Sequence, residues 1–345
     1  MRWILLLGLV MSGSFCKNST PETGPTESVG PIALADIPWD GTRVSQHLKE
    51  LTAAPHYFGS PRQKELAAYL EAEARKLELS VQVDTFQATV PDPAALTGVT
   101  SMMQNTTLQL TGYNVYARLP IEGATCVILI GSHYDSKRLE GVESLGANDS
   151  GSSSAALLEL MRAFQTPALK QRLRCSLMAV WFDGEEAYLP EWLDGETRHP
   201  SGIKDHLYGS RHLAGRLEAC GAQQCLPQAL GGERVQQMLL LDMIGMPNAQ
   251  LTLDRYSTPE LLALAQRLDK AYYQGRLYRD SYPKPVMDDH IPFLAKGIPS
   301  LNLIDFENLN TWHTSQDRLE TLALSSIEDI SKLAVALIVA WNSGG

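Results

Sequence analysis

Acidic and histidine side chains follow three apolar stretches of this sequence, at the point where each stretch ends. His133 follows the run CVILIGS, Asp183, Glu185 and Glu186 follow SLMAVWF, and Asp242 follows MLLL. Burying a carboxylate without a partner is costly, so an acid such as Asp242 should face a metal, a cation or a hydrogen-bond network. We therefore expect these side chains to form one polar site.

Further candidate side chains lie in the segments GANDSGSS, MDDH and WHTSQD, which supply Asp149, Asp288 and His313. Each has an ordinary explanation when taken alone. An aspartate just before a helix commonly caps it, and a lone histidine is usually a hydrogen-bonded surface residue. The coincidence of so many acids and histidines at strand ends and loops favours a metal site over this set of separate explanations.

Histidine and carboxylate ligands without thiolates suit a catalytic zinc ion that keeps one coordination position open. No Cys-x-x-Cys spacing is present to suggest a thiolate site. A loop beyond a strand can direct two neighbouring side chains to different points around one ion. Of the adjacent pair Glu185 and Glu186, one can therefore hold the metal while the other remains free to transfer protons.

The elements that must position these side chains alternate between apolar strands and helices. Residues 81–90 and 108–120 alternate like the strands of a hairpin or meander. The run at 126–132 is continuously apolar, as expected of a strand buried on both faces, and the largely apolar runs at 176–182, 235–242 and 300–306 are interpreted as further strands. We expect helices at 42–51, 61–77, 150–164, 207–217 and 327–343, with Ser60 as an N-cap. The pattern predicts an α/β fold, with a mostly parallel mixed central sheet and helices on both faces. In such sheets, ligands bind beyond the carboxyl ends of the strands.

The chain has 345 residues, of which 44% are hydrophobic and 20% charged, as expected of a globular protein with a substantial core. Its formal net charge of -10 argues against nucleic-acid binding through a basic surface. We expect an export signal at 1–16, because Arg2 precedes a short apolar run and small residues follow it. Residues 17–38 are expected to form a flexible tether, and 39–345 a single catalytic domain.

The five cysteines bear on export, because an exported protein can form disulfides. Cys16 precedes a segment rich in Ser, Thr, Pro and Gly, which raises the alternative of a lipid-modified N-terminus, although the bulky Phe15 argues against it. Cys220 and Cys225 bracket a short loop and could pair. Cys126 and Cys175 lie in apolar runs and are interpreted as small core residues. We expect a periplasmic, membrane-anchored or secreted protein.

The segments GSHYDS, GANDSGSSSAALLEL, FDGEEA, LYGSRHLA, LLLDMIG and WHTSQD together resemble the zinc-dependent aminopeptidase superfamily, over most of the chain from about residue 39. The stretches MDDHIPFLAKGIPSLNLI and NTWHTSQDRLETL are similar to its glutaminyl-peptide cyclotransferase branch, the animal-type glutaminyl cyclases. The resemblance implies the phosphorylase/hydrolase-like fold of zinc aminopeptidases. It also implies an acyltransferase that converts the N-terminal glutamine of peptides or proteins to pyroglutamate and releases ammonia.

Site residues follow from the same resemblance. It implies one zinc ion per chain and a general acid/base at Glu185. We also expect a monomer. His133 is interpreted either as a ligand of a second metal or as a residue that supports the metal ligands. The full set implied is Asp149, Glu186 and His313 as zinc ligands, Asp242 and Asp288 as acids that hydrogen-bond near the catalytic centre, and Trp192 and Trp312 as substrate-binding tryptophans. Because close carboxylates cannot all ionise cheaply, we expect Asp242 and Asp288 to share a proton and to tune Glu185.

Two alternatives remain open. In a secreted aminopeptidase with two zinc ions, His133 and Asp242 would hold the second metal and Asp149 would bridge the two. In a binding or receptor domain on a peptidase scaffold, ligands would be expected to be lost, whereas Asp149, Glu186 and His313 are all present.

Overall fold

The computed structural model describes residues 32–93, 107–190 and 203–343. Within these ranges, one sheet has eight strands in the order β1-β2-β4-β3-β7-β6-β5, with β10 pairing along β7. The bounds of its strands are β1 Ser80–Pro91, β2 Thr107–Leu119, β3 Cys126–His133, β4 Ser176–Phe182, β5 Glu218–Cys220, β6 Gln223–Cys225, β7 Arg234–Asp242 and β10 Ser300–Ile304. A separate pair, β8 (Leu253–Asp254) and β9 (Pro283–Lys284), is parallel.

The centre of the sheet is parallel and its margins are antiparallel. Strands β4, β3, β7 and β10 run parallel to one another, so their carboxyl ends lie at the same edge. The hairpin of β1 and β2 joins this centre antiparallel to β4, and the short β5–β6 hairpin meets β7 at Arg234. The predicted α/β class, the mixed sheet and the predicted hairpin are confirmed.

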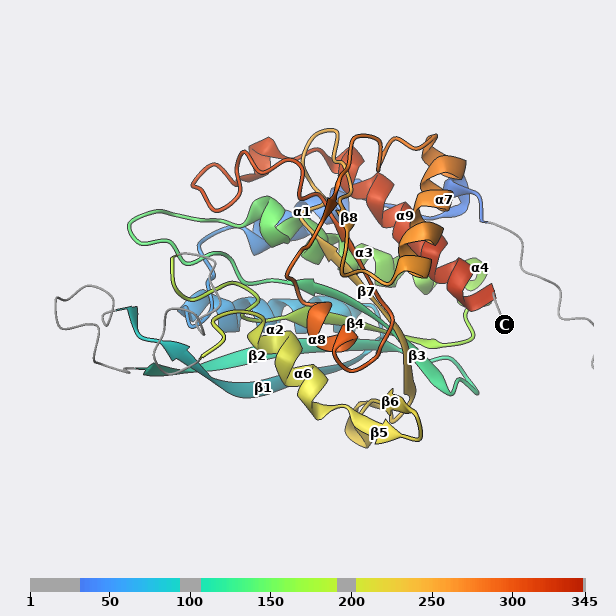
Figure 1. The fold of residues 1–345 in the computed structure, drawn as a ribbon, viewed down its shortest axis with the longest axis horizontal. Coiled ribbons are helices and arrows are strands. Elements are labelled where there is room, and N and C mark those ends of the chain that lie inside the picture. The colour runs from blue at the N-terminus through green and yellow to red at the C-terminus, as the bar shows by residue number, and fades with distance from the viewer. Residues whose placement is uncertain (1–31, 94–106, 191–202, 344–345) are drawn as a thin grey trace, which may run out of the picture. The chain divides into compact units, whose positions relative to one another are not determined.

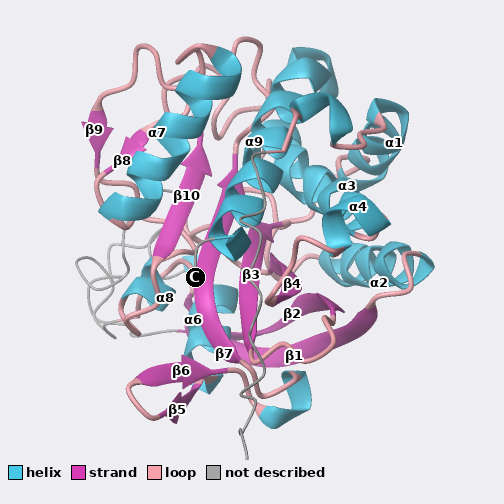
Figure 2. Ribbon diagram, turned by 90° about the vertical axis from the view of Figure 1, so that its right-hand side faces the viewer, coloured by secondary structure: helices cyan, strands magenta, loops and turns pink. Residues whose placement is uncertain are grey.

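Helices cover both faces of the sheet, as predicted (Figure 1, Figure 2). The apolar strand residues alternate between two buried clusters, one on each side. The larger cluster is formed with α1, α2, α3, α7 and α9, and the smaller one with α6 and α8. The bounds are α1 Gly41–Leu51, α2 Pro61–Lys76, α3 Ser153–Phe164, α4 Pro167–Lys170, α6 Tyr208–Arg216, α7 Pro259–Tyr273, α8 Ile291–Leu294 and α9 Leu324–Ser343.

The predicted N-cap of α2 is confirmed, because the Ser60 side chain accepts a hydrogen bond from the backbone N–H of Gln63. The predicted tether extends too far, however. Ile32 and Ile37 are buried in the larger cluster, and the Tyr272 hydroxyl donates a hydrogen bond to the carbonyl of Ile32. Their apolar side chains pack on the domain, which begins before residue 39. The predicted export signal at 1–16 lies outside the described residues.

The prediction that Cys126 and Cys175 are free core residues is wrong, because they form a disulfide. Cys126 begins β3 and Cys175 directly precedes β4, so neighbouring parallel strands bring two buried cysteines side by side. Cys220 and Cys225 also form a disulfide, across the β5–β6 hairpin. None of the helices within the described ranges is both long and apolar enough to span a bilayer.

Candidate active site

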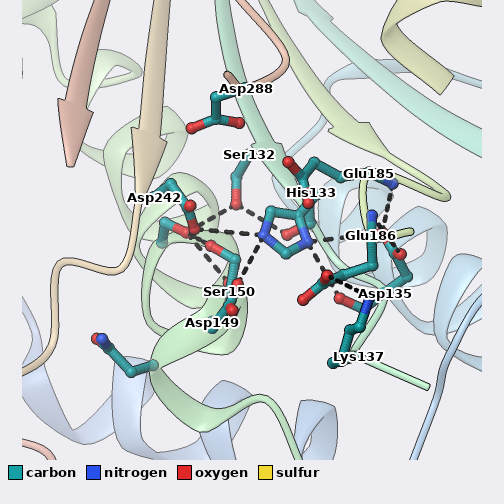
Figure 3. A network of polar contacts seen from close by, with 12 residues as sticks. Ser132, His133, Asp135, Lys137, Asp149, Ser150, Glu185, Glu186, Asp242 and Asp288 are labelled. Carbon is teal, nitrogen blue, oxygen red and sulfur yellow. Dashed lines mark hydrogen bonds and ion pairs between the residues drawn. The ribbon is translucent and has the colours of Figure 1, made fainter. Parts of the chain in front are cut away.

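The carboxyl ends of β3 and β7 place His133 and Asp242 together. His133 Nε2 lies 3.3 Å from Asp242 Oδ1 and 3.1 Å from Asp149 Oδ1. The other ring nitrogen of His133 lies 3.0 Å from the backbone carbonyl oxygen of Asp135, which fixes the orientation of the ring. Figure 3 shows the imidazole of His133 in the middle of the acids that the sequence pattern singles out.

Glu185 and Glu186 reach the site through a tight turn after β4. Gly184 in this turn has a φ of +72°, and a Cβ added to it would lie 2.7 Å from the ring of Phe58. Both backbone N–H groups of the glutamates donate to the Asp135 carboxylate, at 3.0 Å for Glu185 and 3.2 Å for Glu186. Asp135 thereby fixes the two neighbouring side chains in different directions.

Asp149 and His313 complete the cluster from two loops. The N–H groups of Asn148 and Asp149 donate to the Asp317 carboxylate, at 2.7 Å and 3.1 Å, which joins the loop before α3 to the loop that carries His313. His313 Nε2 lies 3.0 Å from Glu186 Oε1 and 3.5 Å from Asp149 Oδ2. The predicted ligands Asp149, Glu186 and His313 are therefore adjacent.

Among the residues that the structure describes, two groups of side chains could each hold a metal ion. One consists of Asp149, Glu186 and His313, and the other of His133, Asp149 and Asp242; in each, ligand atoms lie within 4.8 Å of one another. Buried oxygens of Asp242 (Oδ1) and Glu186 (Oε2) have no hydrogen-bond partner among the described residues. Buried carboxylates and imidazoles that converge in this way fit a zinc ion.

The site carries a strong negative field. Burial lowers the pKa of His313, but the carboxylates of Glu186 and Asp149 outweigh burial and raise that pKa to about 9. Burial raises the pKa of Asp149, yet its contacts with His133 and His313 bring it below its ordinary value. Charges that attract a proton to His313 so strongly also attract a metal cation.

Glu185 is buried and belongs to neither group of candidate ligands. Burial raises the pKa of its carboxyl well above the ordinary range; His133 opposes the rise, and Asp288 and Glu186 add to it. A group that takes up and returns a proton near neutral pH works best with such a raised pKa. The acid/base role of Glu185 stays a prediction.

A cavity of about 250 Å³ opens on these side chains. Its polar end is lined by Asp149, Glu185, Glu186, Asp242, Asp288 and His313. Its remaining wall is apolar. Trp312 lies in this wall, with its ring stacked on His313 at 3.9 Å between centroids. The apolar wall is formed by Met243, Pro285, Val286, Met287, Ile304, Phe306 and Trp312.

Asp288 lies in the cavity, but its hydrogen bonds differ from the predicted pairing with Asp242. Its Oδ2 accepts from the Asn302 side chain at 2.8 Å, and its Oδ1 accepts from the backbone N–H of Asp289. Burial, together with Asp242 and Asp289, raises the pKa of Asp288 well above its ordinary value. Asp288 thus interacts with Asp242 and Asp289 through the charges of their carboxylates.

Asp183 does not join the site. Its carboxylate accepts hydrogen bonds from the backbone N–H of Tyr113, at 2.7 Å, and from the Gln63 side chain. It therefore supports β2 and α2. The predicted substrate-binding residue Trp192 lies outside the described residues.

Comparison with known proteins assigns the family. The family model described as "Peptidase family M28" matches residues 114–338. The chain is 30% identical over 316 residues to the glutaminyl-peptide cyclotransferase of Drosophila melanogaster, and the match covers 83% of this chain and 77% of the relative. The chain belongs to peptidase family M28.

Solved structures of the same fold include two with different activities in their names. The glutaminyl cyclase of an Acidobacteriales bacterium matches with a TM-score of 0.69 at 23% identity, over 97% of this chain and 100% of the other. A leucine aminopeptidase precursor from Bacteroides thetaiotaomicron matches with a TM-score of 0.70 at 18% identity, over 88% of this chain and 98% of the other. At these identities the matches confirm the fold alone.

Three residues that support the candidate site of this M28 chain were not predicted from the sequence, namely Lys137, Asn302 and Asp317. Lys137 is buried, with Nζ 2.7 Å from the carbonyl oxygen of Ala187 and 3.6 Å from Glu186 Oε2. Asp135 and Asp317 fix the backbone of the candidate ligands, and Asn302 holds Asp288. Position is the signal that could have found two of them, since Lys137 lies four positions after His133 and Asp317 lies in the same WHTSQD segment as His313.

Proposed function

We propose that this chain cyclises the N-terminal glutamine of peptides and proteins to pyroglutamate, with release of ammonia. The observation that carries the proposal is that Glu185, which is not among the candidate ligands, opens into the same cavity as the candidate metal group. The D. melanogaster relative, named a glutaminyl-peptide cyclotransferase and matched over most of its length, supports this particular reaction.

We propose one zinc ion per chain, held by Asp149, Glu186 and His313. These residues supply two carboxylates and one imidazole, a set that leaves a coordination position open. When bound, zinc supplies a Lewis acid that polarises a carbonyl group and stabilises negative charge developing on its oxygen.

The side chains of the cavity then have separate tasks. The α-amine nitrogen of glutamine attacks the carbon of its own side-chain amide, a C–N bond forms to close the five-membered lactam, and the bond to the amide nitrogen breaks. Glu185 takes a proton from the amine and returns it to the leaving nitrogen, which departs as ammonia. The apolar wall with Trp312 holds the side chain folded back and excludes water.

Substituting Glu185 with glutamine tests this assignment of roles. The change keeps the size of the side chain but removes its ability to carry the proton, so kcat should fall about 10²- to 10⁴-fold. Ammonia release from Gln-peptides and zinc content should be measured on the same samples. A Glu185→Gln protein that retains its zinc and near-normal turnover would contradict the role of Glu185.

The second group, His133, Asp149 and Asp242, supports a second candidate function, that of an aminopeptidase with two zinc ions. Metal content and product discriminate between the two. One zinc per chain with ammonia release supports cyclisation. Two zinc ions per chain with release of free N-terminal amino acids would show that the chain hydrolyses peptides and would contradict the proposed cyclisation.

We also propose that the chain is exported as a monomer, and that it is secreted, periplasmic or anchored through a lipid on Cys16. The two disulfides support an oxidising compartment. Mass spectrometry of the mature N-terminus tests the export signal and distinguishes a lipidated Cys16 from a cleaved, unmodified chain. Sedimentation of the purified protein tests the monomer.

A further inference from the structure

The carboxylate of Asp254, which lies outside the cavity lining, contacts both ends of the segment 286–290 that carries Asp288. Asp254 is the last residue of β8 and is fully buried. Its Oδ1 accepts a hydrogen bond from the backbone N–H of Val286 at 3.1 Å. Its Oδ2 lies 2.9 Å from Nε2 of His290, which is also fully buried. One side chain therefore fixes the two ends of a five-residue segment.

Ser257 extends these contacts to Asp288 itself. The Ser257 hydroxyl donates to Asp254 Oδ2 at 2.8 Å and accepts from the backbone N–H of Asn302 at 3.0 Å. The side chain of Asn302, on β10, in turn donates to Asp288 Oδ2 at 2.8 Å. A continuous series of hydrogen bonds thus connects Asp254 to the acid that faces the cavity.

The segment needs such an anchor because it crowds acids together. It lies between β9 and α8 without strand pairing of its own, and it carries Asp288 and Asp289, both buried. Asp242 and Asp289 raise the pKa of Asp288 in addition to the effect of burial, so bringing these carboxyls together costs free energy. The contacts of Asp254 with both ends of the segment offset this cost.

The position of the segment also sets the shape of the cavity. Val286 and Met287 form part of the apolar wall, and Asp288 contributes to the polar end beside Glu185. A shift of about 1 Å in such groups can cost about a hundredfold in rate. Movement of this segment would therefore affect both substrate binding and the chemical step.

We propose that Asp254 and His290 form a clamp that positions Asp288 and the adjoining cavity wall for reaction. Asp254 is thus a positioning residue, acting through the segment 286–290. Its effect on turnover rests on the proposed cyclisation, whereas its effect on the segment does not.

The clamp is tested by Asp254→Asn in the full, zinc-loaded chain. The amide keeps the size of the side chain. Its NH₂ group takes the place of one carboxylate oxygen, however, and cannot accept the hydrogen bonds that this oxygen accepts in the parent. Asp269→Asn is a matched control, because Asp269 is equally buried and accepts backbone N–H bonds from Leu277 and Tyr278, at 3.0 Å and 3.1 Å, outside the segment.

Two readouts are measured for each variant. Hydrogen exchange of a peptide spanning 283–295 reports on the segment without reference to activity, and ammonia release gives kcat and KM. Asp254→Asn should speed exchange at Val286 at least tenfold, lower kcat at least tenfold and raise KM, with zinc content unchanged. Asp269→Asn should lower Tm but leave exchange in the segment and kcat within about twofold of the parent.

His290→Gln provides a second variant if Asp254→Asn does not fold, because it leaves Asp254 its donors at Tyr256, Ser257 and Val286. The double variant should lose no more kcat than the more impaired single variant, since both break one clamp. Unchanged exchange and kcat in Asp254→Asn, or equal losses in Asp269→Asn, would overturn the proposal. If the parent releases no ammonia, the proposed function fails, and the exchange measurement still decides the clamp.

Discussion

Removing the disulfide between Cys126 and Cys175 should destabilise the domain more than removing the one between Cys220 and Cys225. The two bridges join residues that are 49 and 5 positions apart. In the chain-entropy model, the constraint on the unfolded chain stabilises the protein by about 4 kcal/mol for a loop of about 50 residues and about 2 kcal/mol for a loop of about 6. The two double-alanine variants should therefore differ by about 2 kcal/mol in free energy of unfolding.

Urea unfolding of the parent and both double-alanine variants measures this difference, with midpoints compared at constant slope. Turnover should be preserved in both, because Cys126 lies at the start of β3, about 23 Å along the strand from His133 at its end. Equal midpoints for the two variants, or a larger loss from the short hairpin, would refute the loop-length argument. Loss of turnover in a folded Cys126→Ala/Cys175→Ala protein would show that the bridge affects the site.

Two further predictions concern buried polar groups. Burial lowers the pKa of His56 to about 4, so the folded state favours the neutral imidazole. The free energy of unfolding should therefore be highest above pH 6.5 and should fall by about 3 kcal/mol as the pH falls from 6.5 towards 4. In urea unfolding with a chelator present, His56→Asn should lose less free energy of unfolding than the parent over this pH range. Asp317→Asn should weaken zinc binding about 10- to 100-fold, because Asp317 fixes the backbone of Asp149. Equilibrium dialysis measures the zinc affinity. Asp305→Asn is the control, because it alters a buried acid in another loop. Unchanged zinc affinity in Asp317→Asn would contradict the role given to that carboxylate.

Much of the fold could be predicted from the sequence because its periodicity is strong. Strands β3, β4 and β10 are buried along their whole length and β7 is buried over its last five residues, so their sequences are largely apolar. The rule that polar residues meet at the carboxyl ends of such strands correctly joined His133 to Asp242. The same rule failed for Asp183, because the turn at Gly184 sends the glutamates into the site while Asp183 remains on the side facing Gln63.

Pairings between distant segments could not be predicted from local patterns. Whether Cys126 meets Cys175 depends on which strands are neighbours and in what register, and apolar character alone is equally consistent with two separate core residues. The Asp254–His290 contact likewise joins two segments 36 positions apart that have no shared periodicity. Ile32 and Ile37 were assigned to the tether because they directly follow residues 18–31, which are rich in Ser, Thr, Pro and Gly.

Asp149 belongs to both candidate ligand groups, which means that the two groups cannot fill independently. A cation bound by either group neutralises part of the negative charge of Asp149, which would also attract a cation to the other group. The first cation also repels a second cation a few ångströms away. Occupancy of one position should therefore lower the affinity of the other. This negative cooperativity would separate a metal titration into two steps, and the number of ions bound would then depend on the concentration of free metal around the protein.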